Sequence, residues 1–217
     1  WSGSTDLEVV PMSPLQTLGF ALGTSFASGL NLYATVATAG LLSYFGVIQL
    51  PPSLAILAHP VVWGIAVGLF IIEFVADKIP AVDSVWDAIH TFIRPPAAAL
   101  ISYSAFGNVP EIWKLGAALL AGSVAFTSHG AKATTRAAAN TSPEPFTNWA
   151  LSSVEDILAV GLSWLAATHP ILTGAIVIVL VILSVIVIWT LLGFFKRVFG
   201  RLRGGPAVPA NQANVGT

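Results

Sequence analysis

Residues 115–140 read LGAALLAGSVAFTSHGAKATTRAAAN, and this stretch joins an apolar run to a charged run with no loop between them. Its second half carries a polar side chain at every third or fourth position, at His129, Lys132, Arg136 and Asn140. On a helix this spacing places all four side chains on one face. An ionised side chain at the centre of a bilayer costs about 2.5–3.5 kcal/mol on insertion scales. The stretch therefore predicts a helix whose polar stripe is paired or hydrated inside the protein.

The rest of the chain is as apolar as this stretch. Of its 217 residues, 55% are hydrophobic and only 9% are charged, whereas soluble domains carry about 25% charged residues. Residues 9–72 contain no acidic or basic side chain apart from His59, and residues 157–195 contain none apart from His169. Because a helix needs about 20 apolar residues to cross a bilayer, the sequence predicts an all-α, polytopic membrane protein with about five or six membrane segments.

Glycine-rich and proline-rich stretches divide the chain into segments. The first segment is too long for one straight span, and SGLN at residues 28–31 predicts a break in its middle, because glycine and asparagine weaken helices. Prolines interrupt the chain again at residues 51–52 and 143–145, since proline cannot continue a helix. The predicted segments are residues 15–45, 59–79, 112–138, 146–168 and 171–195, with a shorter apolar element at 94–108.

Residues 81–94, AVDSVWDAIHTFIR, predict a helix of a different kind. Its charged or titratable side chains share one face, at Asp83, Asp87, His90 and Arg94. Valine, isoleucine and tryptophan fill the opposite face, so the helix is amphipathic. It either lies in the membrane interface or docks its charged face against a polar core.

Two pairs of matching stretches indicate an internal repeat. FASGLNLYAT at residues 26–35 aligns with FTSHGAKATT at residues 126–135, and HPVVWGIAV at 59–67 aligns with HPILTGAIV at 169–177. Transporters often consist of two such halves with interrupted helices at the site between them. We therefore expect a first membrane repeat at residues 12–108, a second at 109–197, and helix breaks near Gly29 and Gly130.

The two ends of the chain differ from the apolar segments. Residues 1–11 precede the only methionine, Met12, and we interpret them as an added segment before the native start. Residues 198–217 are basic at first and then rich in glycine, proline, alanine and asparagine, which predicts a disordered tail. Because basic flanks remain in the cytoplasm, we expect a cytoplasmic C-terminus.

Carboxylates are available to neutralise the polar stripe. Glu73 and Asp77 lie four residues apart near the end of the second segment, and Glu155 and Asp156 are adjacent in the fourth. We expect the two halves to bring these carboxylates to the stripe, around a polar cavity. The predicted substrate-binding residues are His129, Lys132, Arg136, Asn140, Asn31, Glu73, Asp77, Glu155 and Asp156, with Asp83, Asp87, His90 and Arg94 in support.

The same charges also have a purely structural interpretation. Lysine and arginine at the ends of spans commonly serve as interfacial anchors, whose long stems let the charge reach water. This interpretation applies to Lys78, Arg94 and Lys114, and to Arg136 because it lies near the end of its segment. Asn31 would then only satisfy backbone groups that the helix break sets free.

Several classes of chemistry find no support in the sequence. The chain has no cysteine, which excludes disulfides and thiolate sites. It has no phosphate-binding glycine loop, GxSxG or HExxH motif, and no two of its four histidines lie three or four residues apart. We therefore predict no catalytic residue, no metal site and no cofactor. The basic tail favours contact with anionic membrane lipid, and nothing indicates nucleic-acid binding.

Three stretches give the chain a resemblance to a known family. They are ASGLNLYATV at residues 27–36, FVADKIPAVDSVWDAIHTFIRPPA at 74–97 and SHGAKATTRAAANTSPEPFTNWALSSVEDILA at 128–159. Over residues 15–195 the chain resembles a bacterial membrane family known as domain of unknown function 4126. The resemblance implies an integral membrane protein and carries no activity with it. We expect a multi-pass protein of the bacterial inner membrane.

These observations lead to a hypothesis of transport. The polar stripe would attract a small solute, an ion or a lipid headgroup, with an anionic group favoured, while the carboxylates balance the charge or exchange protons. One alternative is a membrane scaffold or assembly factor that binds a protein partner through residues 81–94. Another is a membrane-embedded enzyme acting on lipid, with Glu73, Asp77 or His129 as acid or base. The small residues around Lys132 would also suit a homodimer.

Overall fold

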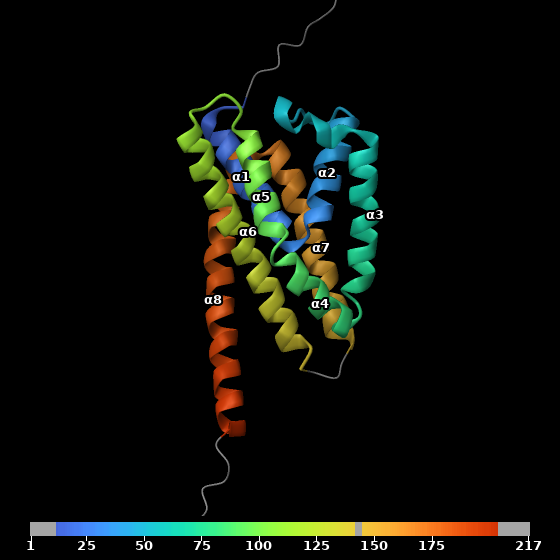
Figure 1. Ribbon diagram of the computed structural model, residues 1–217, viewed down its shortest axis with the longest axis vertical. Helices are drawn as coiled ribbons and strands as arrows, with labels where there is room; N and C mark the ends of the chain where they lie inside the picture. Colours follow the sequence, from blue (N-terminus) through green and yellow to red (C-terminus); the bar gives the residue numbers. More distant parts are fainter. Residues whose placement is uncertain (1–11, 142–144, 204–217) are drawn as a thin grey trace, which may run out of the picture.

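The computed structural model describes residues 12–141 and 145–203, and within these ranges every regular element is a helix. The predicted all-α class is confirmed. Figure 1 shows the helices side by side, with α8 along one edge and α3 along the other. The elements are α1 (Pro14–Leu30), α2 (Leu32–Tyr44), the 3-10 helix η1 (Pro52–Ala58), α3 (Pro60–Ala76), α4 (Pro80–His90), α5 (Arg94–Ala105), α6 (Glu111–Ala139), α7 (Pro145–Thr168) and α8 (Pro170–Arg203).

Parts of the predicted ends fall outside the described residues. The added segment at residues 1–11 lies there, as do residues 204–217 of the predicted tail. The basic start of that tail is not separate from the last segment, because α8 continues through it to Arg203.

Helix α1 lies at the centre of the bundle and packs against α5, α6, α7 and α8. Three glycines allow this close approach. Gly19 faces the backbone of Pro170, Gly23 faces α7 and α8, and Gly29 faces Ser128 of α6. Within a membrane the hydrophobic effect does not drive helices together, and small residues of this kind allow neighbouring backbones to approach closely. The helix therefore fixes the positions of the elements that carry the charged residues.

The predicted break in the first segment is confirmed and is one residue wide. Helix α1 ends at Leu30 and α2 begins at Leu32, with Asn31 between them in an extended conformation. The Asn31 Oδ1 atom accepts a hydrogen bond of 2.9 Å from the backbone N–H of Ala34. This bond caps the start of α2, as asparagine does at many helix N-termini.

The predicted second break, near Gly130, is wrong. Helix α6 runs without interruption from Glu111 to Ala139. A single glycine costs a helix only about 1 kcal/mol, and the residues that follow Gly130 include several alanines, the best helix formers, such as Ala131 and Ala133. Since the break at Asn31 has no counterpart in α6, the predicted repeat is not confirmed by this pair of positions.

Two helices are long and apolar enough to cross a membrane, at Phe146–Thr168 in α7 and Pro170–Val198 in α8. The pair η1 and α3, bent by 64°, adds a third span if it counts as one. The predicted number of five or six is not confirmed, because α1 and α2 are short and α6 is charged along its second half. Exposed isoleucines along α8, at Ile178, Ile182 and Ile186, are consistent with a membrane protein.

The predicted amphipathic helix is α4, but it ends at His90, and Arg94 begins α5 instead. Its charged face points inward, where Asp83 and Asp87 are 1% and 5% exposed. Its apolar face points outward, where Val85 and Ile89 are more than half exposed. Of the two orientations that the sequence allowed, the structure has the one that docks the charged face against a polar core.

We predict that Gly29→Ala lowers the thermal stability of the protein in detergent. A methyl group at this position would overlap Ser128 Oγ and the Ala125 carbonyl oxygen of α6, and overpacking of this kind costs about 1–3 kcal/mol. The matched control is Gly68→Ala in α3, where no heavy atom lies within 4 Å of the added carbon. Equal melting temperatures for the two variants would contradict the close approach of α1 and α6.

Candidate functional site

Nine buried charged side chains meet on the inner side of α4, and we call them the ionic cluster. None of them is more than 8% exposed. They come from the end of α3, the inward face of α4, the start of α5, the second half of α6 and the middle of α7. The cluster consists of Glu73, Asp77, Asp83, Asp87, Arg94, Lys132, Arg136, Glu155 and Asp156.

Lys132 lies at the centre of the cluster. Its Nζ atom is 3.1 Å from Asp77 Oδ2 and 3.3 Å from Glu73 Oε1. It also donates a hydrogen bond of 3.2 Å to the carbonyl oxygen of Leu30. The ammonium group thus binds two carboxylates of α3 and the last carbonyl of α1 at once.

Arg136 lies one helical turn beyond Lys132 and joins three elements. Its Nη2 atom is 2.6 Å from Glu155 Oε2 and 3.0 Å from Asp77 Oδ2. Its Nη1 atom is 3.2 Å from Asp83 Oδ1 and donates to the Asp77 carbonyl oxygen at 2.9 Å. The planar guanidinium can bind several oxygens in fixed directions, so it holds α3, α4 and α7 together.

Arg94 is the third cation of the cluster. It forms a buried ion pair with Glu73, and its Nη1 atom donates to the Gly29 carbonyl oxygen at 2.9 Å. The interpretation of Arg94 as an interfacial anchor is wrong, because its side chain is fully buried. Together with Lys132, it satisfies the two carbonyls at the end of α1, where the helix dipole favours positive charge.

The break at Asn31 lies directly against the cluster. Besides capping α2, the Asn31 amide donates a hydrogen bond of 2.9 Å to Asp156 Oδ1. Asn31 therefore does more than form hydrogen bonds with the free backbone groups at the helix break. It joins the break between α1 and α2 to a carboxylate of α7.

Hydrogen bonds fix His129 as a neutral side chain. Arg94 Nη1 can only donate, and it lies 3.0 Å from His129 Nδ1, so this nitrogen is an acceptor. His129 Nε2 then carries the proton and donates to the Asp87 carbonyl oxygen at 3.1 Å. The Thr91 hydroxyl lies 2.9 Å from the same nitrogen. His129 belongs to the polar stripe, as the sequence predicts, but it adds no positive charge.

His90 is bonded in a similar way from α4. The Trp86 carbonyl oxygen is 2.7 Å from His90 Nδ1, which therefore donates. Tyr33 of α2 lies 2.9 Å from His90 Nε2 and can donate its hydroxyl proton there. Tyr33 and Thr91 were missed by the sequence reasoning, because nothing local marks a lone hydroxyl as the partner of a distant histidine.

The cluster contains more negative than positive groups. Six carboxylates face three cations, so full ionisation would leave an excess of three negative charges in the interior. Several carboxylate oxygens are buried without a hydrogen-bond partner, among them Glu73 Oε2, Asp77 Oδ1, Asp83 Oδ2 and Asp156 Oδ2. Buried polar atoms are normally bonded, so these oxygens are positions where a proton, a water molecule or a cation would be favoured.

Asn140 of the predicted site and the two lysines interpreted as anchors are not members of the ionic cluster. Asn140, at the end of the stripe, accepts a hydrogen bond of 2.6 Å from Asn148. Lys114 forms a surface pair of 3.9 Å with Glu111, as expected for an anchor. Lys78 donates to Ser152 Oγ at 3.2 Å and lies over the ring of Phe74.

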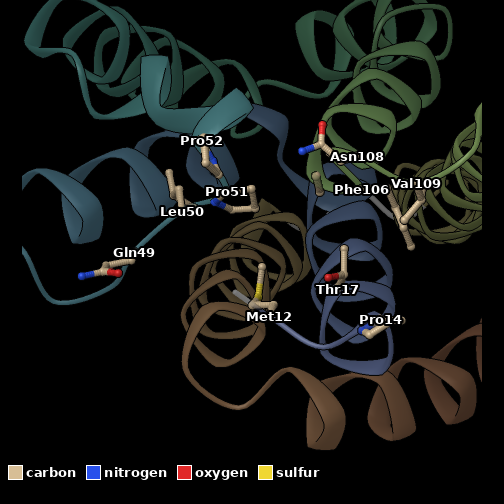
Figure 2. A pocket seen from close by; sticks show the side chains of 12 residues that line it. Met12, Pro14, Thr17, Gln49, Leu50, Pro51, Pro52, Phe106, Asn108 and Val109 are labelled. Carbon is tan, nitrogen blue, oxygen red and sulfur yellow. The ribbon is translucent and has the colours of Figure 1, made fainter. Parts of the chain in front are cut away.

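Two pockets of the described part of the chain lie around the N-terminal end of α1, away from the ionic cluster. The cluster residues contact each other directly, and the polar cavity expected between the two halves remains a prediction. Figure 2 shows the first pocket, of about 500 Å³, between α1, the residues before η1 and the α5–α6 connection. Its labelled lining residues include Met12, Thr17, Pro51 and Asn108, none of which belongs to the ionic cluster.

No metal site is indicated by the described residues, because no group of three or more histidine or acidic side chains converges in a suitable arrangement. The cluster instead has the geometry of an ion-paired network. Its cations alternate with its carboxylates, and each cation contacts at least two elements.

Comparison with known proteins gives one match. The family model described as "Domain of unknown function (DUF4126)" matches residues 18–190. No curated protein and no solved structure matches the chain.

We predict that Lys132→Met is strongly destabilising. It leaves Glu73 and Asp77 buried with less positive charge, and breaking a buried ion pair on one side costs about 3–5 kcal/mol. The control is Lys114→Met, which removes a surface pair and is expected to cost at most about 1 kcal/mol. The free energy of unfolding in detergent is measured for both variants. Equal losses of stability would show that the buried ion pairs of Lys132 contribute no more than a surface pair.

A second prediction concerns pH. Burial raises the pKa of Asp83 from 3.8 to about 6, although Arg136 beside it acts in the opposite direction. Asp83 lies on α4, outside the helices that qualify as spans. The folded protein binds this proton more tightly than the unfolded chain, so the stabilisation is complete below the unfolded pKa and is lost as the pH rises through about 6.

Asp83→Asn should therefore lose less stability than the wild type between about pH 4 and pH 7. Melting temperatures of both proteins across this range give the comparison. Parallel pH profiles would show that Asp83 does not titrate in the folded protein.

Proposed function

We propose that this chain, which belongs to the family described as a domain of unknown function (DUF4126), is a membrane transporter. It moves a small solute, an ion or a lipid headgroup through its charged interior. The observation that carries the proposal is the ionic cluster, since nine charged side chains lie buried in a chain whose outer surface is largely apolar. We place the protein in the bacterial inner membrane, with its C-terminus in the cytoplasm.

Stability alone is a weak reason for such a cluster. Desolvating an ion pair costs about as much as its attraction returns, and apolar side chains of the same volume often give equal or greater stability. Ionisable side chains inside membrane proteins usually mark pathways for substrates, ions or protons. A cluster that joins five helices is therefore better explained by function.

The break at Asn31 supports transport in particular. Transporters bind substrates and coupling ions where helices are interrupted, because the free backbone groups and helix dipoles contribute to the site. Here the carbonyls of Gly29 and Leu30 at the end of α1 are bonded by Arg94 and Lys132. A substrate that displaced either cation would find these carbonyls as ligands.

Helix α4 is the element best suited to open the cluster. Its inward contacts are polar, such as the pair of Asp83 with Arg136 at 3.2 Å, and its outward face is apolar. An outward movement of α4 would expose Arg136 and the unpartnered oxygens of the cluster. The closed packing of these residues then corresponds to an occluded state.

The charge balance favours a cation or a proton as the transported or coupled species. The sequence suggested an anionic group, because it counted His129 together with Lys132 and Arg136. In the structure His129 is a neutral acceptor for Arg94, and the carboxylates outnumber the cations. An excess of negative charge attracts cations and repels anions.

We predict that purified protein in liposomes moves a small cation or protons faster than protein-free liposomes do. Flux is measured with ion-sensitive and pH-sensitive dyes over a panel of monovalent cations, anions and headgroup-labelled lipids. Arg136→Lys keeps the charge but loses the fork that joins Glu155 and Asp77, and we expect about a tenfold lower flux, equivalent to about 1.4 kcal/mol in the barrier.

Lys114→Met serves as the control and should match the wild type. A wild-type flux no greater than that of empty liposomes over the whole panel would contradict the transport proposal. Melting temperatures measured in parallel separate a folding defect from a transport defect.

A further inference from the structure

Asp156 differs from every other carboxylate of the ionic cluster. It takes part in none of the ion pairs in the described residues, whereas each of the other five pairs with at least one cation. Its one hydrogen bond comes from a neutral group, the Asn31 amide, at 2.9 Å. Asp156 is only 6% exposed, and its Oδ2 atom is buried with no hydrogen-bond partner.

The neighbouring residue provides a direct comparison. Glu155 is adjacent to Asp156 on α7 and has similar burial, but Arg136 binds it through Nε and Nη2 at 3.1 and 2.6 Å. A carboxylate removed from water is stable as an anion when it is paired in this way. Without such a pair, burial favours the neutral acid.

The hydrogen bonds of Asp156 fit a protonated carboxyl group. A proton on Oδ2 leaves Oδ1 as the carbonyl oxygen, which still accepts from Asn31. The charges that face the group are mixed. Lys132 of α6 and Lys78 of the α3–α4 connection attract negative charge, while Glu73 and Asp77 of α3 oppose it. No ionisable side chain of α1 or α2 forms a hydrogen bond with Asp156. Tyr33 of α2 bonds to His90 instead.

We propose that Asp156 is the proton-binding site of this protein and that its proton controls the helix break at Asn31. The inference rests on the proposed function, for which it identifies the coupling ion as H⁺. When the proton leaves, the bond from the Asn31 amide becomes charge-assisted and stronger. The same amide caps α2 through Ala34, so the proton acts directly on the junction between α1 and α2.

The junction is also where the cations of the cluster bind backbone. Lys132 donates to the Leu30 carbonyl oxygen, one residue before Asn31. Ionisation of Asp156 adds a negative charge that attracts Lys132, in competition with that carbonyl. Loss of the proton from Asp156 therefore affects the end of α1, through Lys132 and Leu30, and the start of α2, through Asn31.

Infrared spectroscopy of the full-length protein in liposomes tests the inference without requiring transport. The C=O stretching band of a protonated carboxylic acid is recorded while the pH is raised. Because Asp83 also binds a proton up to about pH 6, every protein compared carries Asp83→Asn, and the titration starts at about pH 5, above the usual pKa of exposed carboxyl groups. We expect the protein with the wild-type residue at position 156 to lose this band on titration and Asp156→Asn to lack it over this range. Glu155→Gln is the matched control and should retain it, because Glu155 differs from Asp156 in being bonded by Arg136.

A second variant tests the inference with Asp156 still in place, so that its result does not depend on how a substitution at position 156 affects folding. Asn31→Ala removes the amide that favours the ionised form of Asp156 and should move the titration of the band to higher pH. A band that Asp156→Asn leaves unchanged would overturn the proposal, as would a wild type with no titrating band. So would an Asn31→Ala protein whose band titrates at the wild-type pH.

Transport measurements separate this inference from the proposed function. If protein-dependent flux responds to a pH gradient in the wild type and equally in Asp156→Asn, Asp156 is not the coupling site although transport stands. If the band titrates as expected but no flux occurs with any solute, the proton site stands and the transport function fails.

Discussion

The position of Lys132 is the constraint on which the structure depends. An ammonium group inside an apolar bundle must be neutralised and must use its hydrogen bonds, because the cost of leaving it bare exceeds the stability of many proteins. Lys132 meets this demand with Glu73, Asp77 and the Leu30 carbonyl oxygen. These contacts set the ends of α1 and α3 against α6, and Arg136 extends the arrangement to α4 and α7.

Periodicity predicted the faces of the helices but not their partners. The intervals of three and four residues in α6 and α4 placed the charges on single stripes, and glycine and asparagine predicted the break at Asn31. Arg94 was ambiguous, because its burial depends on Glu73 and Gly29 from other helices. Gly130 was misjudged for a similar reason, since the alanines that follow it and the packing of α6 outweigh the preference of a single residue. The substrate role that the sequence assigned to the site remains a prediction.

Sequence reasoning also overestimated the positive charge of the stripe. A histidine beside lysine and arginine resembles a third cation on paper, but its protonation depends on which groups face its two nitrogens. In this protein Arg94 occupies one side of His129 and a backbone carbonyl occupies the other. The site therefore changes from a cationic stripe to a network with an excess of acid groups, which is why we propose a cation rather than an anion as the species it attracts.

The orientation of α4 has a consequence for biosynthesis. Asp83 is synthesised more than fifty residues before Arg136, the cation that pairs with it in the folded protein. Asp87 has a nearer partner in Arg94, but its second cation, Lys132, also belongs to α6. We therefore expect α4 to dock its acidic face only after α6 has been made, so that a late helix completes the packing of an earlier one.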